Sequence, residues 1–459
     1  MSLAARLPDR LSVVAVVAVV FCLSACTPPG DGVVALEGAT LIDGSGTAPV
    51  ANALLLVKNG HIQLVARANE AAVPRGAVRL TLTGKTIIPG LIDAHAHVER
   101  WAAARYLAWG VTSVRDMHAR PDSGLALRND LDLAAVLGPR MFSAGPMIDG
   151  APSTYQDATG VATADQARKA VDQRAVAGAD YVEIYTRITP ALLRPLMNEA
   201  VVLRLPVAAR LGKIDALAAA RAGVASIEHL SGVVQAAVRD PTPYFRAHER
   251  FLAGWTAEEK GWIALDSVVV ARAARALAQT HVAIVPTLVL HEMLSRLNDP
   301  TLLARPTMAD VPPWAASVRD VAGLLQRGGW RAADFASFRR ARPRQDQFVR
   351  EFSRAGGLIA AGSDAADRLL VPGAALHDEI ELLVAAGLTP LEAIGAATRN
   401  GAHLLHADSL GRLAAGTVAD LVVLNSDPAH DVAATRDIAW VMIRGRIVYP
   451  DSLRREWPK

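Results

Sequence analysis

Residues 87–99 read IIPGLIDAHAHVE, an apolar run that ends in two histidines. The run of Ile and Leu predicts a buried β-strand. Side chains alternate between the faces of a strand, so His95 and His97 point the same way, roughly 7 Å apart along the backbone. Two imidazoles at the mouth of a buried strand can chelate a divalent metal ion. A chain with 12 His also produces such pairs by chance, so the pair alone leaves both interpretations open.

Five later segments follow this strand in a recognisable order. They are GVTSVRDM (110–117), GADYVEIY (178–185), AGVASIEHL (222–230), AAGSDAA (360–366) and GRLAAGTVADLVVLNSDP (411–428). Together with the first strand they resemble the amidohydrolase superfamily, in its imidazolonepropionase and prolidase-like branch. The resemblance covers nearly all of the chain after residue 33, and several motifs in a fixed order are far more specific than any one of them.

Strand and helix patterns alternate through the middle of the chain, which favours βα units around a parallel sheet. Strands are predicted near 88–95, 111–115, 139–144, 180–185, 206–210, 225–229, 282–287 and 358–362. Eight such units suggest a (β/α)₈ TIM barrel at 89–408, with its active site at the carboxyl ends of the strands. Both chain ends, 34–88 and 409–459, carry short strands between turns. The resemblance implies that the two ends form one small flanking β-sandwich.

Two segments, 231–265 and 291–357, are longer than ordinary connections. Both are rich in aromatic residues, and as insertions above a barrel mouth they would form a lid or specificity loops. The alternative, which we favour for most of these residues, is that the aromatic side chains pack locally and the charges face solvent.

The N-terminal residues predict export. Arg6 and Arg10 precede an apolar segment, 11–23, and small residues follow it. The sequence around Cys26 resembles the bacterial lipoprotein box, so we expect a signal peptide at 1–26, a lipidated Cys26, a linker at 27–33 and attachment to the cell envelope. An ordinary signal peptide or a short membrane anchor is the alternative. Both cysteines of the chain lie here, so no disulfide framework is expected downstream.

The composition argues against a nucleic-acid partner. The net charge is only +3, and no basic run carries interleaved aromatic residues. Hydrophobic residues make up 51% of the chain and charged residues 20%, which is typical of a globular protein with a sizeable core. The sequence does not indicate whether the protein is a monomer or an oligomer.

The resemblance assigns roles to residues at the strand ends. His95 and His97 match the first-strand metal ligands, and Asp364 matches the last-strand aspartate that is both ligand and proton shuttle. His229 matches the sixth-strand histidine, with a catalytic, metal or substrate role. The alternatives are ordinary turn chemistry for Asp364 and a structural role for a lone histidine.

Two positions depart from the family pattern. Glu183 stands where the branch usually has a carboxylated Lys that bridges two metals; its carboxylate can itself be a ligand, or it can pair with an Arg. Arg210 replaces the fifth-strand histidine, and a guanidinium cannot bind a cation. We therefore expect one ion per chain, Zn²⁺, held by His95, His97, Asp364 and Glu183. Arg210, with Tyr185, is assigned to substrate binding, and pairing with Glu183 is the alternative for Arg210.

These residues predict a metal-dependent amidohydrolase that breaks the C–N bond of a small amide or cyclic amide by metal-activated water. The departures at Glu183 and Arg210 also leave open a non-catalytic binding protein, a pseudoenzyme on the same fold. A fold does not define a substrate, and dipeptides, N-acyl amino acids, lactams and imides all fit.

Overall fold

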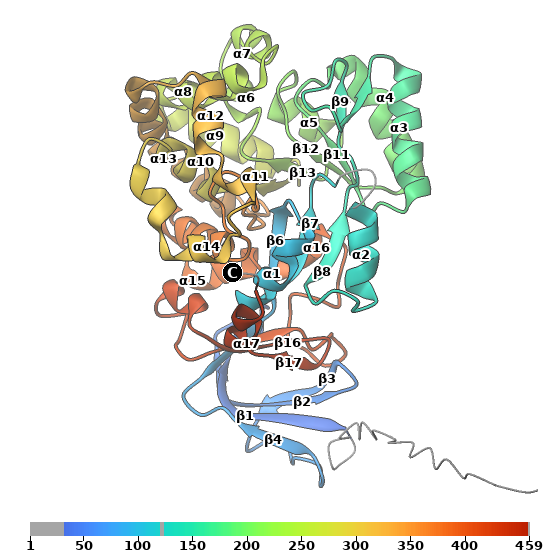
Figure 1. Cartoon of the computed structure of the whole chain (residues 1–459), viewed down its shortest axis with the longest axis vertical. Coiled ribbons are helices and arrows are strands. Elements are labelled where there is room, and N and C mark those ends of the chain that lie inside the picture. Colours follow the sequence, from blue (N-terminus) through green and yellow to red (C-terminus); the bar gives the residue numbers. More distant parts are fainter. Residues whose placement is uncertain (1–31, 120–123, 458–459) are drawn as a thin grey trace, which may run out of the picture.

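The two ends of the chain join in one sheet at the bottom of the molecule in Figure 1. The computed structural model describes residues 32–119 and 124–457. The strands of this sheet are β1 (Val33–Leu41), β2 (Val50–Lys58), β3 (His61–Arg67), β4 (Val78–Thr81), β5 (Thr86–Pro89), β15 (Leu421–Leu424), β16 (Ile438–Ile443) and β17 (Arg446–Val448). Their order is β17-β16-β15-β5-β1-β2-β3, with β4 paired to β1. The antiparallel pair β5–β15 therefore connects the N-terminal and C-terminal segments.

A two-residue turn sets the register of the β2–β3 hairpin. Lys58 pairs with His61, which leaves only Asn59 and Gly60 between the strands. Both residues have positive φ, 51° and 75°. A type I′ turn requires this conformation, and Asn-Gly is the sequence that adopts it most readily. The buried side chains of the sheet pack into a core of their own that includes Leu36, Leu55 and Trp440.

The central domain contains parallel strands whose side chains are almost all buried. The strands are β6 (Leu91–Ala96), β7 (Val111–Asp116), β8 (Arg140–Ser143), β9 (Ile148–Gly150), β10 (Thr159–Val161), β11 (Val182–Ile184), β12 (Val207–Ala209), β13 (Ser226–Glu228) and β14 (Ala283–Val285). They form two ladders, β6-β7-β8 and β10-β9-β11-β12-β13-β14. Seven of the eight predicted barrel strands are present, and the short pair β9–β10 was not predicted.

Backbone hydrogen bonds join the two ladders at both edges. The amide of Asp180 donates to Ser143 O at 2.9 Å, between β8 and β11. On the other side, residues 358–361 occupy the eighth position: Ile359 bridges Ile284 of β14, and the Ala94 amide of β6 donates to Ala361 O at 2.9 Å. The eight positions follow each other in the order of a TIM barrel, so the predicted fold class is confirmed.

The eighth position forms isolated bridges instead of the predicted strand at 358–362. The chain turns at Gly362, where a side chain would have no room: a Cβ there would lie 2.7 Å from the His95 Cβ and 2.9 Å from its amide nitrogen. The next two amides, of Ser363 and Asp364, both donate to His95 O instead of extending a ladder.

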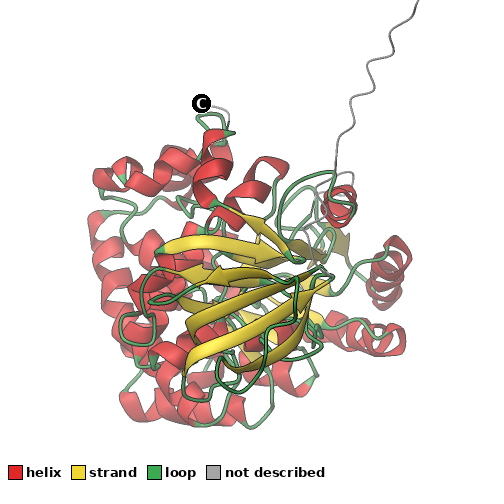
Figure 2. Cartoon of the chain, turned by 90° about the horizontal axis from the view of Figure 1, so that it is seen from below, coloured by secondary structure: helices red, strands yellow, loops and turns green. Residues whose placement is uncertain are grey.

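Helices surround the strands, and in Figure 2, which is seen from below, the strands lie at the centre with helices around them. The α-helices are α1 (Ala103–Ala108), α2 (Gly124–Asp132), α3 (Ala164–Ala177), α4 (Pro190–Leu203), α5 (Ala216–Arg221), α6 (Val233–Ala237), α7 (Thr242–Ala247), α8 (Phe251–Ala264), α9 (Ser267–Ala278), α10 (Leu288–Ser295), α11 (Ala316–Arg319), α12 (Val321–Gly328), α13 (Ala332–Arg354), α14 (Ala374–Ala386), α15 (Pro390–Ala396), α16 (Arg399–Leu404) and α17 (Pro450–Arg455). Short 3₁₀ helices cover Arg100–Ala102, Pro300–Ala304, Pro306–Asp310 and Val432–Arg436. Within the described ranges, none of these helices has the length and apolar character needed to cross a membrane.

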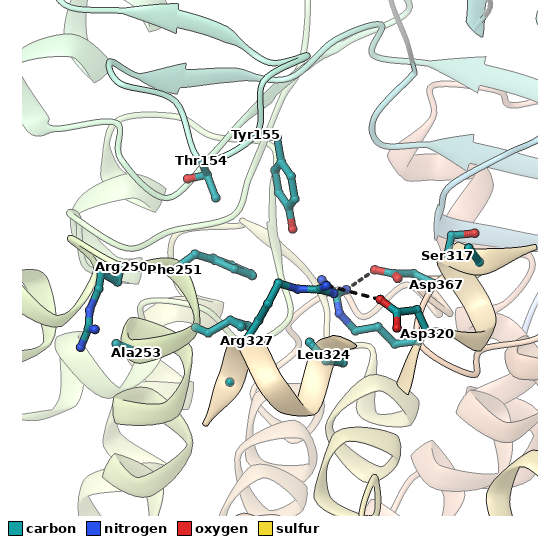
Figure 3. Close-up of a pocket in the computed structure, with 14 residues that line it drawn as sticks. Thr154, Tyr155, Arg250, Phe251, Ala253, Ser317, Asp320, Leu324, Arg327 and Asp367 are labelled. Carbon is teal, nitrogen blue, oxygen red and sulfur yellow. Dashed lines mark hydrogen bonds and ion pairs between the residues drawn. The ribbon is translucent and has the colours of Figure 1, made fainter. Parts of the chain in front are cut away.

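The two long connections form helices beside the barrel mouth. Most of their aromatic side chains pack locally, as favoured from the sequence: Trp255 lies against Trp330 and Phe338, with ring centroids 5.4 and 5.0 Å away. Trp314 differs and is 62% exposed. The same connections, through α8, α11 and α12, line a cavity of about 770 Å³ that opens next to the barrel mouth (Figure 3).

Candidate metal and substrate site

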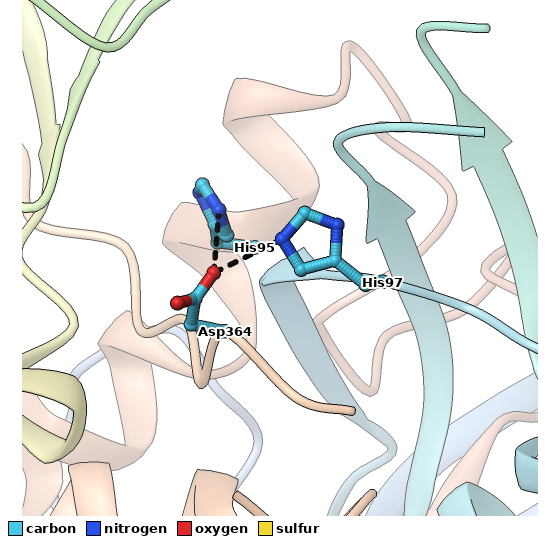
Figure 4. A group of neighbouring side chains, drawn as sticks. All are labelled: His95, His97 and Asp364. Atoms are coloured by element: carbon cyan, nitrogen blue, oxygen red, sulfur yellow. Dashed lines mark hydrogen bonds and ion pairs between the residues drawn. The ribbon is translucent and has the colours of Figure 1, made fainter. Parts of the chain in front are cut away.

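The end of β6 and the turn after the eighth position hold three side chains against each other (Figure 4). His95 lies on β6, His97 follows it, and Asp364 follows Gly362-Ser363. The Asp364 amide donates to His95 O at 2.8 Å, and Ala96 bridges Ala365. These backbone contacts fix the turn next to the strand, so the three side chains start from a rigid frame.

One nitrogen or oxygen from each of His95, His97 and Asp364 can be chosen so that all three atoms lie within 4.8 Å of one another. Nε2 of His95 and Nε2 of His97 are 3.2 and 3.1 Å from Asp364 Oδ1. The second oxygen, Oδ2, is buried without a hydrogen-bond partner among the described residues, and Arg368 Nη1 lies 3.7 Å from it. Two imidazoles and one carboxylate are a donor set that suits Zn²⁺ and related divalent ions. Three of the four side chains that the sequence assigned as ligands therefore fit a metal ion, and the fourth, Glu183, is not part of this group.

A buried carboxylate on β13 orients the first histidine. Nδ1 of His95 donates to Glu228 Oε2 at 2.8 Å, which leaves Nε2 to face Asp364. Such a carboxylate fixes the ring and tautomer of a metal-binding histidine. Burial alone would lower the pKa of His95, but the hydrogen bonds to Asp364 and Glu228 outweigh burial and raise it to about 9. The two carboxylates thus favour a positive charge at His95.

Arg115 on β7 neutralises Glu228 inside the barrel. Its guanidinium donates to Glu228 Oε1 at 2.6 Å, to Ser226 Oγ at 3.0 Å and to Ala94 O at 2.6 Å. Burial would raise the pKa of Glu228, but Arg115 and His95 more than offset this and hold it below its usual value. Glu228 is thus a fixed anion behind the site.

Glu183, at the centre of β11, lines the same cavity as His95 and His97, but it is not a member of the three-residue cluster that these histidines form with Asp364. Its side chain is 2% exposed, and Oε2 has no hydrogen-bond partner within the described part of the chain. Burial raises the pKa of Glu183 to about 8, because the nearby His95 and His97 offset it only in part. Glu183 is therefore a buried carboxyl group at the cavity wall with one oxygen that makes no hydrogen bond to the described residues.

His229 follows β13 in the left-handed conformation, with φ 58°. Thr287 Oγ1 donates to Pro286 O at 2.8 Å, so it accepts the proton of His229 Nδ1 at 2.7 Å. This leaves Nε2 of His229 as an acceptor. Burial and the charges of Arg210 and His95 keep the pKa of His229 well below its usual value, so the ring is neutral.

Arg210, directly after β12, is 7% exposed and lines the cavity. Its guanidinium carbon is 5.4 Å from the ring centre of Tyr185 and 4.8 Å from that of Phe251. Among the described residues it has no carboxylate within 4.0 Å, and the alternative pair with Glu183 does not form. A buried guanidinium between two aromatic faces, with no anion of its own, is suited to an anionic ligand.

The cavity that joins these residues measures about 560 Å³, which is the size of a small-molecule site. It brings together His95, His97, Glu183, Tyr185, Arg210 and His229. The sequence did not identify Glu228 or Arg115. The sequence did contain a signal for them: each is a charged residue inside an apolar strand, and a buried charge needs a partner of opposite charge. Cys26, the predicted lipidation site, lies outside the described residues.

The sequence of residues 86–448 matches the model of the amidohydrolase family. The chain belongs to this family. The match begins at β5 and ends at β17, so it includes the barrel and part of the sheet built from both ends. No curated protein has a sequence that matches this amidohydrolase significantly.

Solved structures resemble this amidohydrolase over almost its full length. A protein from Bifidobacterium longum, described as a prolidase, is 26% identical with a TM-score of 0.69; the alignment covers 93% of this chain and 99% of that one. A Xaa-Pro dipeptidase with methionine bound in its active site is 18% identical (TM-score 0.67; 91% and 100% covered). An ochratoxinase from A. niger is 17% identical (TM-score 0.65; 91% and 95% covered). The last two likenesses concern the fold alone.

Proposed function

We propose that this protein is a metal-dependent hydrolase that cleaves the C–N bond of a small amide bearing a carboxylate. The observation that carries the proposal is the cluster of His95, His97 and Asp364 at the mouth of an amidohydrolase barrel, with one buried carboxylate oxygen that has no hydrogen-bond partner among the described residues. The likeness to a protein described as a prolidase supports an amide substrate. The departures at Glu183 and Arg210 leave this cluster intact, so we favour catalysis over the binding-protein alternative.

His95, His97 and Asp364 would hold one divalent ion, with Glu183 facing it from β11. When bound, such an ion activates a water molecule and polarises the amide carbonyl. Asp364 accepts a proton from the attacking water as its oxygen bonds to the carbonyl carbon. Asp364 then donates that proton to the nitrogen as the C–N bond breaks, because an expelled amide anion is far too basic. The products are a carboxylic acid and an amine.

Arg210 and His229 complete the proposed site. Arg210 would bind the carboxylate of the substrate through its paired N–H groups, while Tyr185 packs against the guanidinium. His229 offers an unprotonated Nε2 to the same cavity, where it can accept a hydrogen bond from the substrate or the reacting water. Neither role requires a second ion.

The test is a panel of N-acyl amino acids, dipeptides and cyclic amides, assayed with and without added Zn²⁺ or Mn²⁺. Asp364→Asn preserves the shape of the side chain but cannot shuttle a proton, so kcat should fall by at least about a hundredfold. Asp165→Asn, an exposed carboxylate on α3, is the matched control and should have normal activity. A folded Asp364→Asn variant with near-normal kcat would exclude this mechanism.

We also propose that the protein is an exported lipoprotein held at the cell envelope through Cys26, as its N-terminal sequence predicts. Replacing Cys26 by Ala should move the protein from the membrane fraction to the soluble fraction. A native protein that is soluble and retains Met1 would contradict this proposal.

A further inference from the structure

Two cavities meet at the barrel mouth. The inner one, about 560 Å³, is lined by His95 and His97 of the three-residue cluster and by Arg210. The outer one, about 770 Å³, lies between α8, α11 and α12. Both are lined by Tyr155, Ser317, Asp367 and Arg368, so these residues form a shared boundary. In Figure 3, the Tyr155 ring points down toward the outer cavity, and Asp367 lies below it to the right.

The boundary is aromatic next to Arg210. The ring centre of Phe251 is 6.2 Å from that of Tyr155 and 5.7 Å from that of Tyr185. Phe251 also covers the Arg210 guanidinium at 4.8 Å, yet it lines the outer cavity. A ligand bound to Arg210 is therefore separated from the outer cavity by only this layer of rings. Aromatic faces of this kind suit an apolar or planar part of a substrate.

The outer cavity has an apolar wall and one cation without a partner. Leu324 is buried in its wall. Arg327 pairs with Asp320 at 3.3 Å, and Arg368 pairs with Asp367 and, at 3.7 Å, with Asp364. Arg250 has no carboxylate within 4.0 Å among the residues that the structure describes, and it lines the cavity from the residue before α8. The free charge of this chamber is therefore positive.

We infer that the outer cavity is a second substrate subsite, which accepts the distal part of an extended amide. The distal part is apolar or aromatic where it passes Tyr155 and Phe251, and it ends in an anionic group near Arg250. The substrate is then longer than a dipeptide or a simple N-acetyl amino acid. This inference rests on the proposed function, because it places the reacting amide beside Asp364.

The test compares two acyl groups on the same carboxyl-terminal amino acid. N-acetyl and N-succinyl-phenylalanyl derivatives of proline, methionine and phenylalanine are assayed in parallel. The long derivative should have a kcat/KM at least about tenfold above that of the short one. Ala253→Trp fills the outer cavity from α8 and should reduce this ratio by about tenfold. If neither derivative is turned over, the proposed function fails, and the ratio of the two affinities measured by calorimetry tests the subsite instead.

A second variant tests the charge. Arg250→Gln should weaken the preference for succinyl over an uncharged butyryl group by about two- to fivefold, as expected for an exposed ion pair. Arg246→Gln, an exposed arginine that lines neither cavity, is the control and should change nothing. The inference would be overturned if the wild type had nearly the same kcat/KM for the long and the short derivative. It would also be overturned if Ala253→Trp left the ratio of these two kcat/KM values unchanged.

Discussion

Replacing Arg115 by Met removes the cation that neutralises Glu228 inside the barrel. Both side chains are almost fully buried, at 3% and 0% exposure. Three hydrogen bonds are lost, to Glu228, Ser226 and the Ala94 carbonyl, while the methionine keeps much of the apolar packing against Tyr181. Removing one partner of a buried ion pair costs about 3–5 kcal/mol, mainly because a charge remains buried without compensation. This is a large share of the stability of a folded domain.

The assay is urea unfolding followed by circular dichroism, with Arg168→Met as the control. Arg168 forms an exposed pair with Asp165 on α3, so its loss should cost at most about 0.5 kcal/mol. The double variant Arg115→Met, Glu228→Gln removes both charges and should recover at least about 1 kcal/mol of the loss. A cost below about 1 kcal/mol for Arg115→Met, or a double variant no more stable than the single one, would refute the reasoning.

Two further predictions concern pH and substrate binding. Burial raises the pKa of Glu379 on α14 to about 8, which the amide of Val289 offsets only in part. Because the unfolded chain loses this proton near pH 4.5, the stabilising contribution is present below that pH and is lost as the pH rises to 8. The free energy of unfolding of the wild type, relative to that of Glu379→Gln, should therefore fall by up to about 1.4 kcal/mol per pH unit between these two pH values. Urea unfolding at several pH values measures this difference, and a difference that does not change with pH would contradict the prediction. Arg210→Met should raise KM for a carboxylate-bearing amide by roughly tenfold to a hundredfold and leave its carboxamide analogue nearly unaffected; equal losses on both would indicate a structural role.

The barrel could be predicted because its strands carry a local signal. The apolar runs before His95 and around Ile227 are short, β-rich and bounded by turns, and these properties do not depend on distant residues. The resemblance then placed His95, His97 and Asp364 in one site although 267 positions separate the last two. The structure brings these three side chains together and leaves out Glu183, the fourth predicted ligand.

Other features depend on contacts that a single strand does not reveal. Arg115 and Glu228 are 113 positions apart and meet across the barrel interior, so their pairing follows from the closure of the strands. The outer cavity depends on how α8, α11 and α12 pack over the mouth, which side-chain patterns do not determine. The sequence was compatible with two roles for Arg210, an ion pair with Glu183 or binding of a substrate. Only the geometry of the folded chain shows that the ion pair does not form.

The most direct test of the proposed site is the metal content of the purified protein, measured by elemental analysis of the full chain. The wild type should contain about one divalent ion per chain. The variant His95→Ala, His97→Ala should contain none while remaining folded by circular dichroism, and its amide hydrolysis should be lost with the metal. A folded wild type that hydrolyses amides without any tightly bound metal, or a double variant that keeps the ion, would contradict the assignment of His95, His97 and Asp364.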